Sequence, residues 1–206
     1  MAAEPKTGSK PYSDACERNQ GPILEVLQRF LIQQSAVLEI GSGTGQHAIH
    51  MARHLPWLTW QTSDLFDRHA GIHCWIAESG LHNVKPPLLL DVTQPWPALD
   101  IDHMYTANTF HIMPWSAVCA TLAGMGRLLS AGGYGFIYGP FNYQGRFTAA
   151  SNAEFDAWLK AERGAHCGIR DAEAVIEQAS VAGLSLVEDN AMPANNHMLV
   201  FKRLSP

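Results

Sequence analysis

Apolar residues along the chain follow two periods. Five segments repeat apolar positions every three to four residues, which is the period of a helix, and seven shorter segments are apolar runs of strand length. From residue 36 to residue 138 the two kinds of segment alternate, which predicts a parallel sheet with right-handed crossovers. The predicted helices are residues 22–34, 45–55, 67–79, 115–129 and 171–182, and the predicted strands are residues 36–40, 58–62, 88–90, 101–107, 134–138, 184–188 and 197–202.

The end of the chain departs from this alternation. The last two predicted strands are joined by a link that is too short for a crossover helix, and Asn195 and Asn196 suit a turn there. Two neighbouring strands with a short link pair antiparallel. We therefore predict an α/β, Rossmann-like fold with a mostly parallel seven-stranded sheet, helices on both faces and a C-terminal antiparallel hairpin.

Composition limits the possible partners and compartments. The 206 residues, 47% hydrophobic and 16% charged, suit one domain, predicted for residues 11–206 after a flexible tail at residues 1–10. No apolar run is long enough for a membrane span, and the N-terminal residues lack the apolar core of a secretory signal. The net charge of −5 argues against a nucleic-acid partner. Four scattered cysteines favour reduced thiols in a cytoplasmic protein. The sequence leaves the oligomeric state open.

A glycine-rich turn joins the first predicted strand to the second helix. It reads Glu39-Ile40-Gly41-Ser42-Gly43-Thr44-Gly45, so its glycines are spaced GxGxG. Dinucleotide enzymes space them GxGxxG and seat a pyrophosphate at the helix N-terminus. The spacing therefore disfavours a nicotinamide oxidoreductase and suits a cofactor without a pyrophosphate. By itself the turn is weak evidence, because any tight strand-to-helix turn favours glycine.

Acidic residues follow the next two predicted strands. Asp64 lies 19 residues beyond Gly45, where a carboxylate can accept hydrogen bonds from ribose hydroxyls. The alternative is a helix N-cap for the segment that starts near Asp67. Asp91 and Val92 follow the third strand and would meet an adenine ring, and a turn or cap role for Asp91 is an equal alternative.

Residues 37–47 (VLEIGSGTGQH) resemble motif I of class I S-adenosylmethionine-dependent methyltransferases. Five further stretches resemble one methyltransferase-like family, catalogued as domain of unknown function 938: residues 15–20 (ACERNQ), 107–112 (ANTFHI), 138–143 (YGPFNY), 169–171 (IRD) and 192–196 (MPANN). The likeness runs from about Lys10 to Lys202, with a small departure at residues 148–151. It implies a methyltransferase fold and S-adenosylmethionine as cofactor, but no methyl acceptor.

The resemblance and the strand ends together predict the cofactor site. We expect Glu39 to lie near the cationic amino-acid end of the cofactor, through backbone or water contacts, and Asp64 to face the ribose. The full set of predicted cofactor-binding residues is Arg18, Glu39, Gly41, Ser42, Gly43, Gly45, Asp64, Leu65, Asp91, Val92 and Asn108.

Methyl transfer needs alignment, exclusion of water and sometimes removal of a proton. The predicted catalytic residues follow the fourth and fifth strands: Asn108, His111 as general base, and Tyr143. Arg18 is expected before the first helix, in a segment that closes over the cofactor and contacts an anionic group. The alternatives are a structural hydrogen bond for His111, packing for Tyr143 and a surface position for Arg18.

The remaining patterns suggest no metal site. His47, His50 and His54 share a helical face, but they project away from the apolar positions and are predicted to face solvent. The leading function is methylation of a small polar molecule. Methylation of protein or RNA and a non-catalytic role as a cofactor-binding sensor or partner subunit stay open as alternatives.

Overall fold

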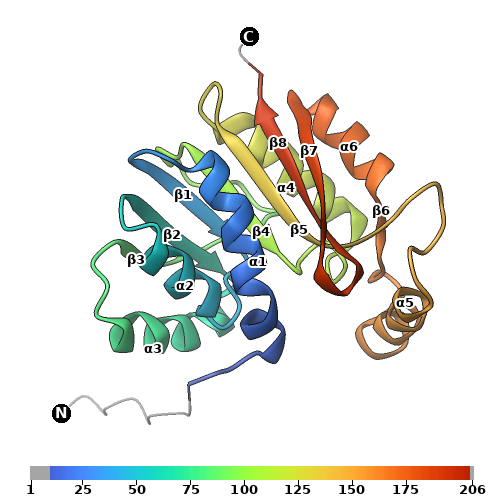
Figure 1. The fold of residues 1–206 in the computed structure, drawn as a ribbon, viewed down its shortest axis with the longest axis horizontal. Helices are drawn as coiled ribbons and strands as arrows, with labels where there is room; N and C mark the ends of the chain where they lie inside the picture. The colour runs from blue at the N-terminus through green and yellow to red at the C-terminus, as the bar shows by residue number, and fades with distance from the viewer. Residues whose placement is uncertain (1–9, 205–206) are drawn as a thin grey trace.

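Eight strands form one sheet in the computed structural model, which describes residues 10–204 (Figure 1). The strand order is β3-β2-β1-β4-β5-β8-β7, and the short β6 pairs with β5 outside this path. The prediction of seven strands was therefore wrong by one, because two residues are too few to show a hydrophobic pattern. The strands are β1 (Ser35–Ile40), β2 (Leu58–Asp64), β3 (Val84–Leu89), β4 (His103–Ala107), β5 (Tyr134–Asn142), β6 (Arg170–Asp171), β7 (Leu184–Met192) and β8 (Asn196–Arg203).

The predicted pairing of the strands is confirmed. Strands β1 to β6 pair in parallel, whereas β8 runs antiparallel to both β5 and β7. The turn between β7 and β8 is the 3-10 segment Pro193–Asn195, in which Ala194 and Asn195 have positive φ. The carboxyl ends of the parallel strands therefore share one edge with the tip of this hairpin, and the C-terminus lies at the opposite end (Figure 1).

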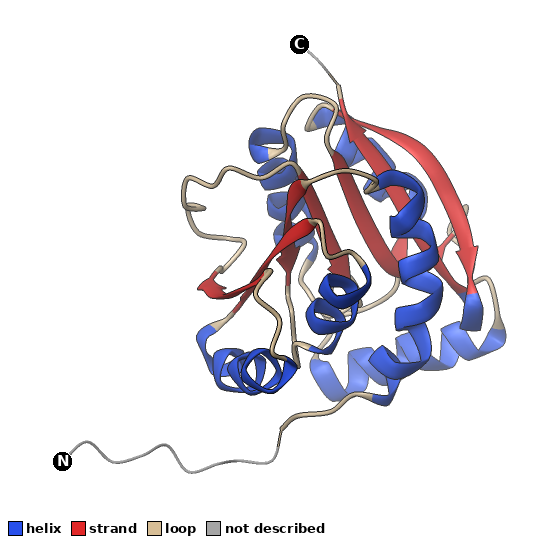
Figure 2. Cartoon of the chain, turned by 60° about the vertical axis from the view of Figure 1, so that its left-hand side comes forward, coloured by secondary structure: helices blue, strands red, loops and turns tan. Residues whose placement is uncertain are grey.

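Helices cover both faces of the sheet, as predicted (Figure 2). The core has one cluster between the sheet and α1 and α2, and another between the sheet and α4 and α6. The helical segments are α1 (Asp14–Phe30), α2 (Gln46–His54), η1 (Phe66–Arg68), α3 (His69–Ser79), α4 (Trp115–Leu128), α5 (Ala150–Arg163), α6 (Ala172–Val181) and η2 (Pro193–Asn195).

Helix α1 begins eight residues earlier than predicted. Its N-cap is Ser13, whose side chain accepts a hydrogen bond from the backbone N–H of Cys16, and Pro22 lies inside the helix. The predicted start at Pro22 is wrong because the first turns are polar and carry no apolar period. Arg18 and Asn19 consequently belong to the helix and do not precede it.

Helix α5 was not predicted. Its buried side chains are Asn152, Asp156 and Leu159, so two of the three positions that face the protein are polar. A hydrophobic pattern cannot show such a face. The helix lies beyond the carboxyl ends of the strands, beside the short β6 (Figure 1).

Residues 10–204 contain no membrane-spanning helix and no cluster of metal ligands. No helix in this range is long and apolar enough to cross a bilayer. No group of three or more His, Cys, Asp or Glu side chains in it is placed to hold a metal ion. All four cysteines are free thiols. Residues 1–9 of the predicted tail lie outside the described residues, and Lys10 contacts Glu78 (2.5 Å) and the ring of Trp75.

Candidate functional site

The glycine turn after β1 is fastened to the end of β2. The backbone N–H groups of Gly41 and Ser42 both donate to the carbonyl of Ser63, at 3.0 and 2.9 Å. Ser42 Oγ accepts the N–H of Ser63 in return, at 3.1 Å. Gly43 has a φ of +57°, and a Cβ built there would meet no atom within 4 Å. The turn is therefore rigid and leaves open space above Gly43.

Asp64 reaches from the last position of β2 to this turn. Its carboxylate accepts hydrogen bonds from the N–H groups of Gly43 and Leu65, both at 2.7 Å. Burial raises the pKa of Asp64, and these two hydrogen bonds oppose the rise. The N-cap positions of η1 and α3 are Leu65 and Arg68, so the helix-cap alternative for Asp64 is wrong.

Apolar side chains are exposed around Asp64. Leu65 is 50% exposed and Phe66 77%, and Leu89, the register partner of Asp64 on β3, is 62% exposed. Exposed apolar side chains grouped beside a polar group are typical of a ligand or partner surface.

Asp91 and Val92, which follow β3, lie in a turn and in the core. One carboxylate oxygen of Asp91 accepts hydrogen bonds from the N–H and the hydroxyl of Thr93, at 2.9 and 2.7 Å. Asp91 thus makes the contacts of a turn residue. Val92 is 9% exposed and belongs to the core cluster on the α4 face.

Glu39 is a buried carboxyl group beneath the turn. It is 2% exposed, and its partner is the indole N–H of Trp60 at 3.1 Å. Burial raises the pKa of Glu39 to about 7, against the hydrogen bonds from Trp60 and Ser42 that lower it. A cation placed next to this group would favour its ionised form.

His47 joins a buried polar network and does not face solvent, contrary to the prediction. Its Nε2 lies 2.7 Å from Asn19 Oδ1, and its Nδ1 lies 3.2 Å from the hydroxyl of Tyr105. Burial lowers the pKa of His47 to about 4. Helix α2 is enclosed by α1 on one side and the sheet on the other, which an apolar pattern for one face does not reveal.

The loop after β4 touches the glycine turn. Asn108 adopts φ +58°, a conformation that costs free energy in residues other than glycine and is least costly for Asn. Its N–H donates to the carbonyl of Tyr138 at 2.8 Å. The methyl of the next residue, Thr109, would lie 2.7 Å from a Cβ at Gly41, so only glycine fits there.

His111 lies further along the same loop, against β5 and α5. It is 7% exposed, and its ring packs edge-on against Phe155 with centroids 5.4 Å apart. Its Nδ1 would be 3.8 Å from a Cβ at Gly139, so the ring faces β5. Burial, and secondarily the charge of Arg170, lower the pKa of His111 to about 4. The imidazole is therefore neutral at pH 7.

Tyr143 belongs to a different cluster from Asn108 and His111. Its hydroxyl donates to Asp189 at 2.6 Å and lies 2.8 Å from Nδ1 of His197, which is itself 2.7 Å from Asp189. Sequence reasoning did not identify Asp189 or His197, because they come from β7 and β8 and no local motif connects them.

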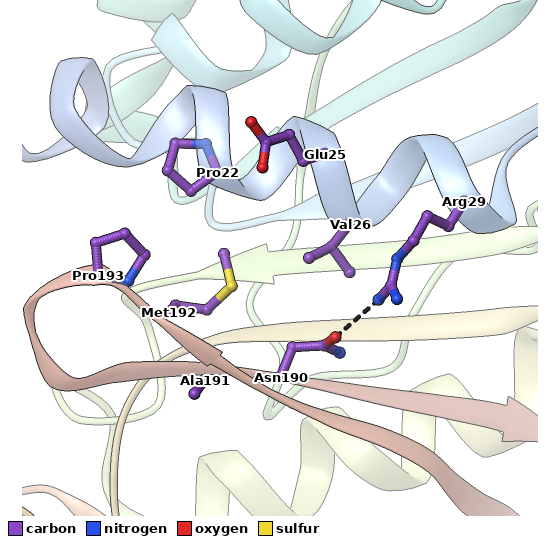
Figure 3. A pocket seen from close by; sticks show the side chains of 8 residues that line it. All are labelled: Pro22, Glu25, Val26, Arg29, Asn190, Ala191, Met192 and Pro193. Atoms are coloured by element: carbon purple, nitrogen blue, oxygen red, sulfur yellow. Dashed lines mark hydrogen bonds between the residues drawn. The ribbon is translucent and has the colours of Figure 1, made fainter.

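Arg18 is exposed on α1 and forms no ion pair with any residue from 10 to 204. It lies one helical turn before Pro22 and on the same helix face. Pro22 lines a hollow of about 350 Å³ between α1 and β7 (Figure 3). The other residues that line this hollow are Glu25, Val26, Arg29, Asn190, Ala191, Met192 and Pro193.

The structure thus assembles part of the predicted site. The glycine turn, Asp64 and the loop with Asn108 are in direct contact at one edge of the sheet. His111 shares that loop but sits deeper, Tyr143 bonds to β7 and β8, and Arg18 lies on the surface.

Solved structures of methyltransferases share this fold. An O-methyltransferase family protein from Burkholderia thailandensis aligns with a TM-score of 0.81 and 18% identity over 93% of this chain and 58% of that one. Human N-acetylserotonin methyltransferase in complex with SAM gives 0.77 and 12% over 93% and 53%. An O-methyltransferase family 2 protein from Planctomyces limnophilus in complex with apigenin gives 0.73 and 15% over 85% and 52%.

This chain spans little more than half the length of those structures, and at such low identity the likeness establishes the fold. The family comparison covers nearly the whole chain, since the model described as "Protein of unknown function (DUF938)" matches residues 10–203. The chain has a methyltransferase fold and belongs to the DUF938 family.

Proposed function

We propose that the chain is an S-adenosylmethionine-dependent methyltransferase that acts on a small polar molecule. The observation that carries the proposal is the contact between the glycine turn, Asp64 and the Asn108 loop at the carboxyl edge of the sheet. Ligands of open α/β sheets bind at that edge. The fold shared with methyltransferases supports the choice of cofactor.

The residues present fit this cofactor. The space above Gly43 admits a ligand, Asp64 offers carboxylate oxygens for ribose hydroxyls, and Glu39 offers a buried carboxylate for an ammonium group. Leu65 and Phe66 offer exposed apolar surface for a base. S-adenosylmethionine supplies a methyl group that is already activated on a sulfonium, so the protein needs no nucleophile of its own.

The acceptor would bind over the ends of β4 and β5. We assign His111 the role of proton acceptor, because it is the imidazole on the loop that follows β4 and it faces β5. Phe155 of α5 covers this ring and helps to exclude water. Asn108 would orient the acceptor from its strained position, and Arg18 would contact it from the surface of α1.

The test is transfer of a labelled methyl group from S-adenosylmethionine to fractions of a metabolite extract. We expect label in a small-molecule fraction, and loss of that label with Asp64→Ala. Label found only in protein or RNA would replace the small acceptor by a macromolecular one. Cofactor binding without transfer to any fraction would contradict the enzymatic assignment and favour a sensor or partner subunit.

A further inference from the structure

Two buried oxygen atoms near the end of β5 have no hydrogen-bond partner in the described part of the chain. They are Oδ1 of Asn142 and Oδ1 of Asp171, and neither accepts a hydrogen bond from any residue between 10 and 204. The two residues are register partners in the parallel pair of β5 and β6. Their side chains therefore leave the strands on the same side, about 5 Å apart. Buried acceptors without donors reduce the stability of the folded protein, so the presence of two such atoms next to each other needs an explanation.

No cationic side chain among residues 10–204 forms an ion pair with Asp171. The guanidinium of the adjacent Arg170 donates instead to the backbone carbonyls of Phe110, Met113 and His166. Within the described part of the chain, Asp171 forms no ion pair. It occupies the N-cap position of α6, but its side chain makes no capping hydrogen bond. The carboxylate of Asp171 thus forms neither an ion pair nor a capping hydrogen bond with residues 10–204.

The segment that carries Asp171 is held against the loop of His111. The N–H of Gly168 donates to the carbonyl of His111 at 2.9 Å. Cys167 Sγ lies 3.4 Å from the carbonyl of Ile112, and Arg170 adds its bonds to Phe110. The unpaired oxygens and the proposed proton acceptor therefore belong to one tightly connected region.

We propose that Asn142 and Asp171 form a subsite that binds an amino group of the methyl acceptor. A primary ammonium carries three N–H donors on one nitrogen, so it can serve both oxygens and neutralise the carboxylate. A hydroxyl group has one donor and no charge. This inference rests on the proposed function, because it names the class of acceptor for that same site: a small primary amine.

The first test measures the melting temperature of the protein without ligands. Asp171→Asn and Asn142→Ala remove groups that have no partner, so we expect each to leave the melting temperature unchanged or raise it by about 2–4 °C. Asp156→Asn is the matched control, since Asp156 is also buried but accepts bonds from Lys160 and Ile169. We expect the control to melt several degrees lower. A comparable loss in all three variants would show a structural role and overturn the proposal.

The second test adds small amines in the presence of saturating S-adenosylhomocysteine. Phenethylamine and ethanolamine are each compared with the alcohol of matching skeleton, 2-phenylethanol and ethylene glycol. We expect at least one amine to raise the melting temperature more than its alcohol, and its dissociation constant to increase at least tenfold in Asp171→Asn. Equal effects of amines and alcohols, or amine binding that survives both substitutions, would overturn the proposal.

Calorimetry with S-adenosylhomocysteine separates this inference from the proposed function. If S-adenosylhomocysteine binds and the amines do not, the amine subsite is wrong and the cofactor site stands. If S-adenosylhomocysteine itself does not bind, the proposed function fails, and the acceptor class fails with it.

Discussion

The two halves of the carboxyl edge of the sheet differ in whether their polar groups have hydrogen-bond partners among residues 10–204. In the proposed cofactor half, at the ends of β1 and β2, the carboxylates of Glu39 and Asp64 both accept hydrogen bonds from the protein. In the proposed acceptor half, at the ends of β5 and β6, Asn142 and Asp171 each have a buried oxygen that accepts no hydrogen bond from residues 10–204. Among residues 10–204, the two carboxylates of the cofactor half thus have hydrogen-bond donors without a ligand, whereas the two buried oxygens of the acceptor half have none.

We interpret this difference as a division between cofactor binding, which methyltransferases share, and acceptor binding, which is particular to each enzyme. The cofactor half is fixed by backbone hydrogen bonds between the glycine turn and Ser63, so a ligand meets a surface that already exists. The acceptor half is also fixed by hydrogen bonds, but its two buried oxygens lack donors among residues 10–204. We propose that an ammonium group supplies these donors. We infer that selectivity for the substrate resides at the ends of β5 and β6.

The largest predicted effect separates turnover from cofactor binding. His111→Gln should lower the methyl transfer rate about 10²- to 10⁴-fold, the range typical for loss of a general base. The dissociation constant of S-adenosylhomocysteine, measured by calorimetry, should stay within about twofold, because His111 packs against β5 and α5 and is not among the residues proposed to hold the cofactor. The exposed His82→Gln is the control. An unchanged rate, or equal losses of rate and cofactor affinity, would remove His111 from its role.

The second effect concerns stability and pH. The folded-state pKa of His47, about 4, lies below the ordinary value of 6.5. Its contribution to the free energy of unfolding is therefore complete above pH 6.5 and is lost as pH falls through 4, by about 3 kcal/mol. Urea titrations at several pH values should show a smaller acid loss in His47→Gln than in the wild type. Parallel pH profiles would contradict the buried, neutral state of this ring.

The third effect tests the ribose contact. Asp64→Ala should weaken S-adenosylhomocysteine binding by about 1–3 kcal/mol, and Asp64→Asn by less, because an amide oxygen still accepts one hydrogen bond. The exposed Asp67→Ala serves as the control. Identical dissociation constants for Asp64→Ala and the wild type would mean that another residue holds the ribose.

The smallest effect is a pH dependence of cofactor affinity. Since the pKa of Glu39 is raised to about 7 by burial, its carboxyl is mostly protonated at pH 6 and half ionised at pH 7. The ionised form binds the ammonium group of S-adenosylhomocysteine, so affinity should rise roughly fivefold over this interval. Glu39→Gln should bind equally at both values. A wild-type affinity that is flat with pH would exclude Glu39 from the ammonium contact.

Local sequence patterns describe the ends of β1 and β2 better than the ends of β5 and β6, for a physical reason. The glycine turn lies within seven residues, and Asp64 ends the adjacent strand, so local patterns describe them. The proposed acceptor half combines Asn142 of β5 with Asp171 of β6, and the cluster of Tyr143 combines residues of β7 and β8, which only the folded chain brings together. Asp189 and His197 belong to no motif. Asn142 and Asp171 lie in the stretches 138–143 and 169–171, but no local pattern shows that these two residues pair.

Two further errors have the same origin. The polar start of α1 and the polar inner face of α5 bury hydrogen-bonded side chains, such as Asn19 and Asn152, instead of apolar ones. His47 is buried for the same reason, since its partners are Asn19 and Tyr105. Hydrophobic periodicity detects burial only where the buried side chains are apolar.

The most direct test of the cofactor site is isothermal calorimetry of the whole chain with S-adenosylhomocysteine, with NAD as the control. We predict one S-adenosylhomocysteine bound per chain, no measurable heat with NAD, and weaker binding in Asp64→Ala. Absence of S-adenosylhomocysteine binding to the folded wild-type protein, or a preference for NAD, would contradict the central claim.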